Sequence, residues 1–244
     1  MSIDIRPLIT PADFVDANRV EVETWGPQEA TPGALLTVFA HHGGLVLGAY
    51  HNSEIVGVSL GFPGLDECGA PYLHSHLLAV LPAYRGQGVG EALKRQQRVY
   101  AQAVKLPYVG WTYDPLMAPN AWFNLGVLGA RVAALKANAY GVLDDDINRG
   151  LPTHRFWVVW DARDGGDPAG THGEEERMMS IPPNIAVWRR DDLPRACAAY
   201  EEWFARAQQW WGQGWRIAGV RRVEKGIEYR WVRAHAEGGL ASAD

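Results

Sequence analysis

The distribution of apolar and polar residues predicts alternating strands and helices over the first 160 residues. Two apolar runs, 45–50 and 55–60, are separated by four polar residues, which predicts a β-hairpin. Apolar residues then recur at helical spacing from Gly88 to Leu106. Further strands are expected at 3–7, 72–80, 108–113, 132–140 and 155–160, and further helices at 11–25, 32–40 and 118–128.

A polar stretch separates this pattern from a smaller second unit. Residues 161–176 contain almost no apolar side chains, so a linker is expected over 161–178. The chain is therefore predicted to have a main domain over 1–160 and a small C-terminal unit of helix and hairpin over 179–244. Asp191 or Asp192 is in position to cap the helix. Its expected buried face consists of Tyr200, Trp203, Phe204, Ala207 and Trp211.

Composition narrows the class of protein. With 47% hydrophobic and 21% charged residues, the chain of 244 residues is typical of a globular protein. Its formal net charge of −5 argues against diffuse attraction to nucleic acid or to an anionic membrane, so neither is an expected partner. There is no signal-peptide pattern and no stretch near the roughly 18 apolar residues of a membrane span. Cys68 and Cys197 are expected to be reduced thiols in a cytoplasmic protein.

The segment most informative for chemistry is Arg85-Gly86-Gln87-Gly88-Val89-Gly90, which joins the end of an apolar strand to a helix. Its glycines let the backbone adopt positive φ angles and approach a ligand closely. The first amides of a helix lack partners within it and lie at the positive end of its dipole, which suits phosphate or pyrophosphate. Glu91 stands where a dinucleotide-binding motif has its third glycine, and Gly-Lys-Ser/Thr is absent, so both nucleotide motifs are excluded. The alternative is a plain tight turn that caps a helix.

The pattern Leu-Ala-Val-x-Pro-x-Tyr-Arg-Gly-x-Gly-Val-Gly over 78–90, together with the order of elements over about 1–160, resembles the GNAT superfamily of acyl-CoA-dependent N-acyltransferases. The resemblance implies an α/β (α+β) fold with a central mixed, mostly antiparallel sheet flanked by helices. It also implies that the loop amides hold the pyrophosphate of coenzyme A and that the strand edge pairs with pantetheine. The implied cofactor-binding residues are Leu78, Ala79, Val80, Arg85, Gly86, Gln87, Gly88, Val89, Gly90, Glu91, Asn120 and Asn124.

A narrower resemblance concerns one branch of this superfamily. The segments 111–116, 138–141 and 151–153, and the Trp-rich second unit after a polar linker, look like that branch. Some of its members occur alongside N-acylamino acid racemases, which implies an amino acid as the acceptor. The apolar stripes and tryptophans of the second unit also suggest a homodimer formed through it, with core packing as the alternative.

Candidates for proton transfer follow from the chemistry of amide formation, because the attacking amine must lose a proton. His74 takes the place of a glutamate base that many GNAT members have on this strand, although it is equally well explained as a satisfied strand residue. His74 and His76 with Cys68 are a conceivable metal site, but no metal is expected. Leu125 stands where many members have a tyrosine acid. Tyr113, Asn120 and Asn124 are the candidate substitutes, with core packing the alternative for Tyr113.

Two further residues are candidates for binding the acceptor. Glu21 lies near the end of the first helix, in a region that often lines the acceptor groove, although a solvated helix face also explains it. Arg155 is suited to a bidentate pair with a carboxylate, either that of the acceptor or one in the acidic loop at 144–146.

The sequence therefore predicts an N-acyltransferase that moves an acetyl, succinyl or other short acyl group from coenzyme A to a small amine by direct attack. A covalent acyl-enzyme is not expected, since neither cysteine has an evident activating partner. The competing hypothesis is a binding module, which holds acyl-CoA as a sensor or scaffold without turnover. This hypothesis is suggested by Leu125, which stands where many GNAT members have a tyrosine acid.

Overall fold

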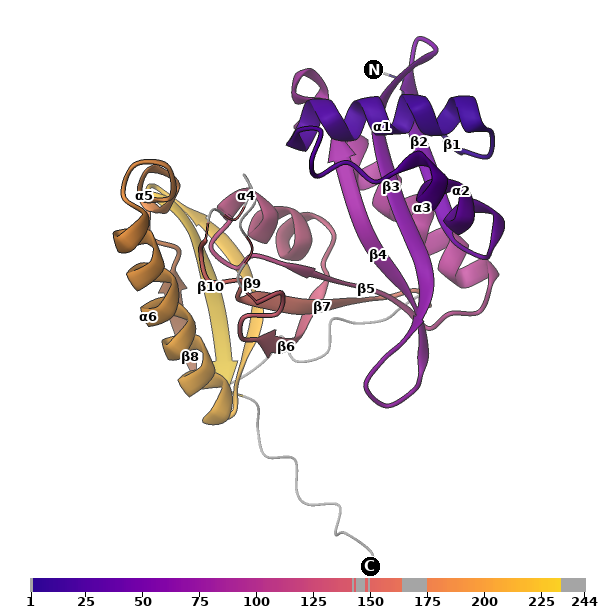
Figure 1. The fold of residues 1–244 in the computed structure, drawn as a ribbon. Coiled ribbons are helices and arrows are strands. Elements are labelled where there is room, and N and C mark those ends of the chain that lie inside the picture. The colour runs from indigo at the N-terminus through magenta and orange to yellow at the C-terminus, as the bar shows by residue number, and fades with distance from the viewer. Residues whose placement is uncertain (1, 142, 144–147, 149, 164–174, 234–244) are drawn as a thin grey trace, which may run out of the picture. The chain divides into compact units, whose positions relative to one another are not determined.

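The computed structural model describes residues 2–141, 143, 148, 150–163 and 175–233 (Figure 1). The strands are β1 (Asp4–Pro7), β2 (Leu45–His51), β3 (Glu54–Leu65), β4 (Pro71–Val80), β5 (Tyr108–Tyr113), β6 (Arg131–Lys136), β7 (Arg155–Asp161), β8 (Glu176–Ser180), β9 (Trp215–Val223) and β10 (Gly226–Arg233). The helices are α1 (Pro11–Trp25), α2 (Gly33–His41), the 3₁₀ turn η1 (Pro82–Tyr84), α3 (Val89–Ala103), α4 (Ala118–Ala121), the π-helical η2 (Trp122–Val127), α5 (Ile185–Asp191) and α6 (Leu193–Gly212).

The strands form a seven-stranded sheet in the order β1-β2-β3-β4-β5-β7-β6 and a three-stranded sheet in the order β8-β10-β9. The strands β1 to β4 are antiparallel neighbours, whereas β4 and β5 run parallel. This mixed, mostly antiparallel sheet flanked by helices confirms the predicted fold class. In the described part of the chain, no helix is both long and apolar enough to cross a membrane.

Contacts divide the chain into two compact units. The first consists of residues 1–111 with two later segments, and the second of residues 112–143, 150–158 and the C-terminal part. This division falls after Trp111, within β5. The domain boundaries expected from the sequence, 1–160, 161–178 and 179–244, stay a prediction.

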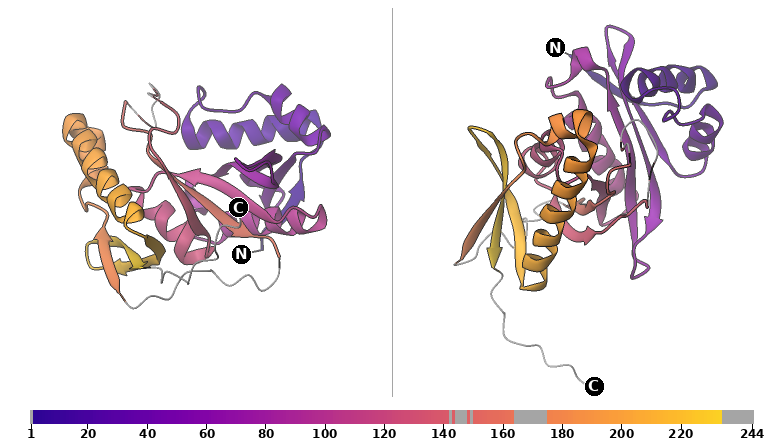
Figure 2. Two further views of the ribbon diagram at one scale, coloured as in Figure 1. Left: turned by 90° about the horizontal axis from the view of Figure 1, so that it is seen from below. Right: turned by 60° about the vertical axis from the view of Figure 1, so that its left-hand side comes forward.

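In the first unit, helices cover both faces of the sheet. Successive residues of a strand point to opposite faces. Phe62 of β3 stacks on Phe39 of α2, with ring centroids 4.8 Å apart, whereas a Cβ on the neighbouring Gly61 would face Gln97 of α3. The helices α1 and α2 therefore lie against one face and α3 against the other (Figure 2).

The first helix begins as its sequence predicts. The Thr10 hydroxyl accepts from the Asp13 amide, and the Asp13 carboxylate accepts from the Thr10 amide at 2.8 Å, which completes a capping box. Phe14, Ala17 and Val20 of this helix are then buried on its sheet-facing side.

The second unit has an aromatic core of its own. Tyr229 and Trp231 of β10 and Trp215 of β9 are at most 2% exposed. Trp203 of α6 packs on Tyr229 with ring centroids 5.4 Å apart and donates from its indole N–H to the Ser180 carbonyl. The predicted buried face of α6 is confirmed at Tyr200, Trp203, Phe204 and Ala207, whereas Trp211 is only half-buried.

Several predicted elements differ from those observed. The helix expected over 118–128 is one turn of α4 followed by π-helical η2, and the strand expected over 132–140 ends at Lys136. Strand β8 begins within the expected linker, and α5 was not predicted. The acidic residues 144–146 and linker residues 164–174 lie outside the described part of the chain.

A half-buried ion pair joins separate segments of the second unit. One Asp114 carboxylate oxygen accepts from the Arg189 guanidinium at 2.8 Å and from the Tyr200 hydroxyl at 2.6 Å, and the other accepts from the Leu116 amide. The side chains of Asp114 and Arg189 are 13% and 16% exposed. Removing one partner of such a pair leaves a charge buried without compensation.

We therefore expect Asp114→Asn to lower the free energy of unfolding by about 3–5 kcal/mol. The matched control is Asp191→Asn, which breaks the exposed pair of Asp191 with Arg190 and should change stability by about 0–1 kcal/mol. Urea unfolding followed by tryptophan fluorescence measures both. Equal effects of the two substitutions would show that the Asp114 network does not hold this unit together.

Candidate active site

The loop between β4 and α3 is shaped to bind an anion. Gly86 and Gly88 have φ angles of 72° and 84°, and an added Cβ at either would meet nothing within 4 Å. Gly88 is the N-cap of α3 and provides no side chain to cap it, so the first helical amides have no partner from that residue. Such amides, at the positive end of the helix dipole, fit a pyrophosphate group.

Two polar side chains of the loop brace it. The Arg85 guanidinium donates to the Val80 carbonyl at 3.0 Å, and the Gln87 side-chain amide donates to the Ala83 carbonyl at 2.7 Å. Both side chains are therefore engaged with the backbone around the loop. The anion site in this geometry consists of backbone amides.

Beside the loop, one edge of β4 lacks a strand partner. The strand is paired with β3 from Pro71 to Val80, but with β5 only at Leu73 and His74, opposite Val109 and Gly110. In the described part of the chain, the edge from Ser75 to Val80 on the β5 side has no ladder. We call this unpaired edge of β4, together with the end of its ladder to β5, the fork. The sequence-predicted pantetheine edge at Leu78 and Ala79 lies along it, while the Val80 carbonyl is taken by Arg85.

A β-bulge lies at the closed end of the fork. Leu60 of β3 pairs with Leu77 and the next residue, Gly61, pairs with Ser75, so His76 is an extra residue in β4. Bulges bend a strand and redirect its side chains. The rings of His74 and His76, two residues apart on the strand, lie on the same face with centroids 6.0 Å apart.

His74 lies in an aromatic cluster on the α2 side of the sheet. Its ring is 5.1 Å from Phe62 and 6.0 Å from Tyr72, centroid to centroid, and the Tyr72 hydroxyl is 3.3 Å from Nδ1. Burial lowers the pKa of His74 to about 4, helped by the charges of His76 and Lys94. The imidazole is therefore neutral at physiological pH and able to accept a proton. If Nδ1 carries the hydrogen and donates to Tyr72, Nε2 is the acceptor.

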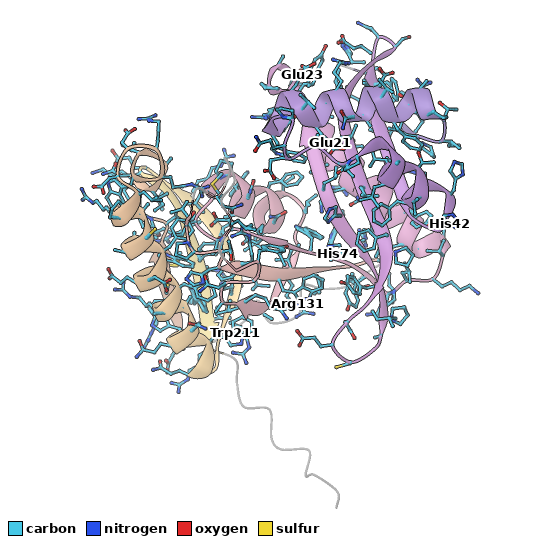
Figure 3. The ribbon with its side chains drawn as sticks, in the orientation of Figure 1. Glu21, Glu23, His42, His74, Arg131 and Trp211 are labelled. Carbon is cyan, nitrogen blue, oxygen red and sulfur yellow. The ribbon has the colours of Figure 1, made fainter. Side chains whose placement is uncertain are left out.

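Glu21 is buried, which corrects the solvated helix face considered for it. The residue is 1% exposed and lies on the sheet-facing side of α1 (Figure 3). One carboxylate oxygen accepts from the Thr31 amide at 2.7 Å, and the other is buried with no hydrogen-bond partner among the described residues. Burial raises the pKa of this carboxyl group. Its role in binding the acceptor stays a prediction, whereas Glu23 is exposed and pairs with Arg19.

The other face of the fork holds a buried polar cluster that sequence analysis did not single out. It consists of Ser59, Ser75, Lys94 and Gln97, all at most 5% exposed. The Lys94 amine donates to the Ser75 hydroxyl at 2.7 Å. Within the part of the chain that the structure describes, the hydroxyl of Ser59 and both polar atoms of the Gln97 amide are buried without hydrogen-bond partners. The sequence pattern that could have revealed the cluster is that Lys94 and Gln97, one helical turn apart, lie on the same side of α3 as buried Leu93.

The remaining predicted residues belong to the second unit. Tyr113 is buried, its hydroxyl is 3.2 Å from that of Tyr229, and burial raises its pKa. Asn120 is exposed on α4, and Asn124 is buried in η2, as is Leu125. The Arg155 guanidinium lies 5.4 Å from the Tyr140 ring centroid and donates to the His154 carbonyl. The catalytic and binding roles of these residues stay predictions.

No metal cluster is found in the described part of the chain: none of its His, Cys, Asp and Glu side chains form a group of three or more that could hold an ion. Asp66, which lies near Cys68, instead accepts from the Cys68 and Ala70 amides and from the Tyr108 hydroxyl.

Comparisons with known proteins identify this segment and the fold. Residues 42–118, which span β2 to the start of α4, match the family model for an acetyltransferase (GNAT) domain. No curated protein matches the chain in sequence.

Solved structures resemble the chain in fold. The ribosomal-protein-S18-alanine N-acetyltransferase of Escherichia coli has a TM-score of 0.54 and 17% identity, covering 68% of this chain and 97% of that one. NAA60 of Arabidopsis thaliana in complex with acetyl-CoA has a TM-score of 0.54 and 14% identity, covering 66% and 98%. The GNAT-like decarboxylase GphF in complex with isobutyryl-CoA has a TM-score of 0.52 and 19% identity, covering 66% and 100%. At these identities the likeness establishes the fold alone, while the family-model match covers residues 42–118.

The glycine loop provides a direct test of coenzyme A binding. We expect Gly88→Leu to weaken acetyl-CoA binding by about a hundredfold or more, because its side chain would project into the anion site and the φ of 84° is strained for leucine. The control is Gly129→Leu, which places the same strain at a φ of 69° outside the loop and should leave affinity within about threefold. Calorimetric titration measures both. Similar losses in the two variants would point to general destabilisation instead of a ligand contact.

The depressed pKa of His74 has a consequence for stability. Between pH about 6.5 and about 4, the unfolded chain binds a proton at His74 that the folded chain does not. Stability from this residue is therefore lost as the pH falls through that interval. We expect the wild-type protein to lose about 2 kcal/mol more than His74→Asn between pH 7 and pH 5 in urea unfolding. Parallel pH profiles would contradict a buried, neutral His74.

Proposed function

We propose that this chain transfers an acyl group from a coenzyme A thioester to the amine of a small acceptor, by direct attack and without a covalent enzyme intermediate. The observation that supports this most is the continuity of the loop and the fork. An anion site made of backbone amides lies at the end of an unpaired strand edge, and the edge leads to a neutral histidine.

In this proposal, the amides at the start of α3 hold the pyrophosphate, and the backbone of Leu78 and Ala79 pairs with the pantetheine amides. The acceptor nitrogen attacks the thioester carbonyl carbon, a C–N bond forms, and the carbonyl electrons move onto oxygen. The C–S bond then breaks and the thiolate leaves. The proton lost by the nitrogen passes to His74, directly or through water. A backbone amide of β4 along the fork stabilises the oxyanion.

Acceptor recognition is proposed to involve the aromatic side of the sheet. Phe62 and Tyr72 flank His74, and both are partly buried on the α2 side of the sheet. Such a surface suits the apolar part of an amino acid or a similar small amine. Glu21, one of whose carboxylate oxygens has no hydrogen-bond partner among the described residues, is a candidate to bind the acceptor amine. The predicted role of Arg155 in binding an acceptor carboxylate stays a proposal of its own.

The second candidate is a sensor that binds acyl-CoA without turnover. Two observations favour it: Leu125 is a buried apolar residue where many relatives have an acid, and a pKa of about 4 makes His74 a weak base. Amine-dependent release of thiol from acetyl-CoA separates the two functions. Binding without release, across a panel of amino acids and polyamines, would leave the sensor as the better account.

His74 is the residue whose replacement tests the catalytic step. We expect His74→Asn to lower kcat/KM for thiol release by about 10²–10⁴-fold, because the amine loses its proton acceptor, while acetyl-CoA affinity stays within about threefold. His76→Asn is the matched control, since His76 lies two residues away on the same face and should lose little activity. If both substitutions lower the rate equally, His74 is not the base.

A further inference from the structure

The fork contains a buried amine with no ionic partner. Lys94 is 3% exposed, its Nζ donates to the Ser75 hydroxyl at 2.7 Å, and it lies 3.5 Å from the centroid of the Trp111 ring. No salt bridge of Lys94 is found among the described residues, and only burial acts on its pKa, which lies well below the usual value.

The amine of Lys94 lies at one end of the fork. The last ladder pair between β4 and β5 is His74 with Gly110. Ser75 and Trp111 are the next residues on the two strands, and Lys94 contacts both side chains from α3. Its amine therefore bridges the strands where they separate, at the end of the fork away from the glycine loop.

Packing alone does not account for a lysine here. A buried ammonium without a counter-ion costs several kcal/mol, so the group is either neutral or paired with an anion. A methionine of similar length would fill the space without this cost. Gln97 and Ser59 add further buried polar atoms without partners on the same side of the sheet. Together these groups form a polar site that the described part of the chain does not satisfy by itself.

Distance along β4 indicates which part of a ligand reaches this site. This step rests on the proposed function, in which pantetheine pairs with β4 at Leu78 and Ala79. Ser75 lies three residues beyond Leu78, which is about 10 Å along a strand. The two carbons of an acetyl group stop short of that distance. A four-carbon acyl chain that ends in a carboxylate spans about 5 Å, and the extended arm between the pantetheine amide and the thioester adds about 5 Å, so the terminal oxygens reach the level of Ser75 and a charge-assisted hydrogen bond to the Lys94 amine.

We propose that Lys94 binds the terminal carboxylate of a dicarboxylic acyl group, so that the chain selects thioesters such as succinyl-CoA over uncharged acyl-CoA of the same length. Ser75 positions the amine, and the Gln97 amide is placed to donate to the same carboxylate. The cation–aromatic contact with Trp111 holds the charged form of Lys94 from the other strand.

The test compares succinyl-CoA with butyryl-CoA, which has the same chain length and no carboxylate. Calorimetric titration of the wild-type protein is expected to show at least tenfold tighter binding of succinyl-CoA. Lys94→Met should abolish this preference while leaving butyryl-CoA affinity within about threefold, and it should fold because it removes a buried charge. Arg95→Met is the matched control, since it removes an exposed cation from the next position of the same helix and should keep the preference.

A second experiment measures the uptake of protons when succinyl-CoA binds. Near neutral pH, a carboxylate beside Lys94 raises the pKa of the amine, so binding of succinyl-CoA should take up to about one proton. The titratable neighbours are His74 on β4, which burial keeps neutral, and Glu91 on α3, which pairs with Arg95. Arg98, one turn further along α3, donates to the Asp161 and Arg163 carbonyls, and Ser59, Gln97 and Trp111 do not titrate. The dependence of binding enthalpy on buffer ionisation should therefore vanish in Lys94→Met.

The outcomes separate this inference from the proposed function. Equal wild-type affinities for the two thioesters, or equal losses for both in Lys94→Met, would overturn the role of Lys94 and leave the proposed function standing. Failure of every thioester to bind would overturn the proposed function and this inference with it. Selective succinyl-CoA binding without amine-dependent thiol release would support the Lys94 site and contradict only the catalytic part of the proposed function.

Discussion

The candidate site depends on one constraint within the sheet: β4 keeps its ladder to β3 along its full length but has a ladder to β5 only up to His74. Backbone amides and carbonyls in a folded protein require partners, so an unpaired strand edge costs free energy unless water or a ligand occupies it. The bulge at His76 lies just beyond the last pair. Alternation along β4 turns His74 to the aromatic face while Ser75 faces α3, and the fork therefore presents different chemistry on its two sides.

The parts of the site that the sequence predicted are those with local signals. The glycine loop was recognisable because strand, glycines and helix follow one another within a few residues, and Gly86 and Gly88 have the positive φ angles that this pattern requires. The strand order beyond β4 was expected only from the resemblance. The point at which β4 leaves β5 could not be read from the chain, because it depends on a register between strands about 35 residues apart.

Residues whose roles depend on distant partners were missed or misjudged. Glu21 has the pattern of a solvated helix face, yet its carboxylate is buried against the Thr31 amide ten residues later. Asp114 belongs to a segment that suggested function by resemblance, but its partners Arg189 and Tyr200 are 75 and 86 residues away. In the structure, Asp114 therefore links separate segments of the second unit. Lys94 was passed over because a long alkyl stem fits an apolar stripe as well as leucine does.

Burial removes charge from both sides of the fork, and this explains how a chain with a net charge of −5 is suited to an anionic ligand. The pyrophosphate site is made of backbone dipoles, whose strength does not depend on net charge. Burial lowers the pKa values of His74 and Lys94, which favours the neutral form of each side chain until a substrate group approaches. A charge then forms only where an opposite charge is present, which avoids the free-energy cost of an unpaired charge in a site of low dielectric. The fold alone does not dictate the reaction, since a GNAT-like decarboxylase shares it. The side chains at the fork, and not the glycine loop, are therefore where the specific chemistry of this chain must be decided.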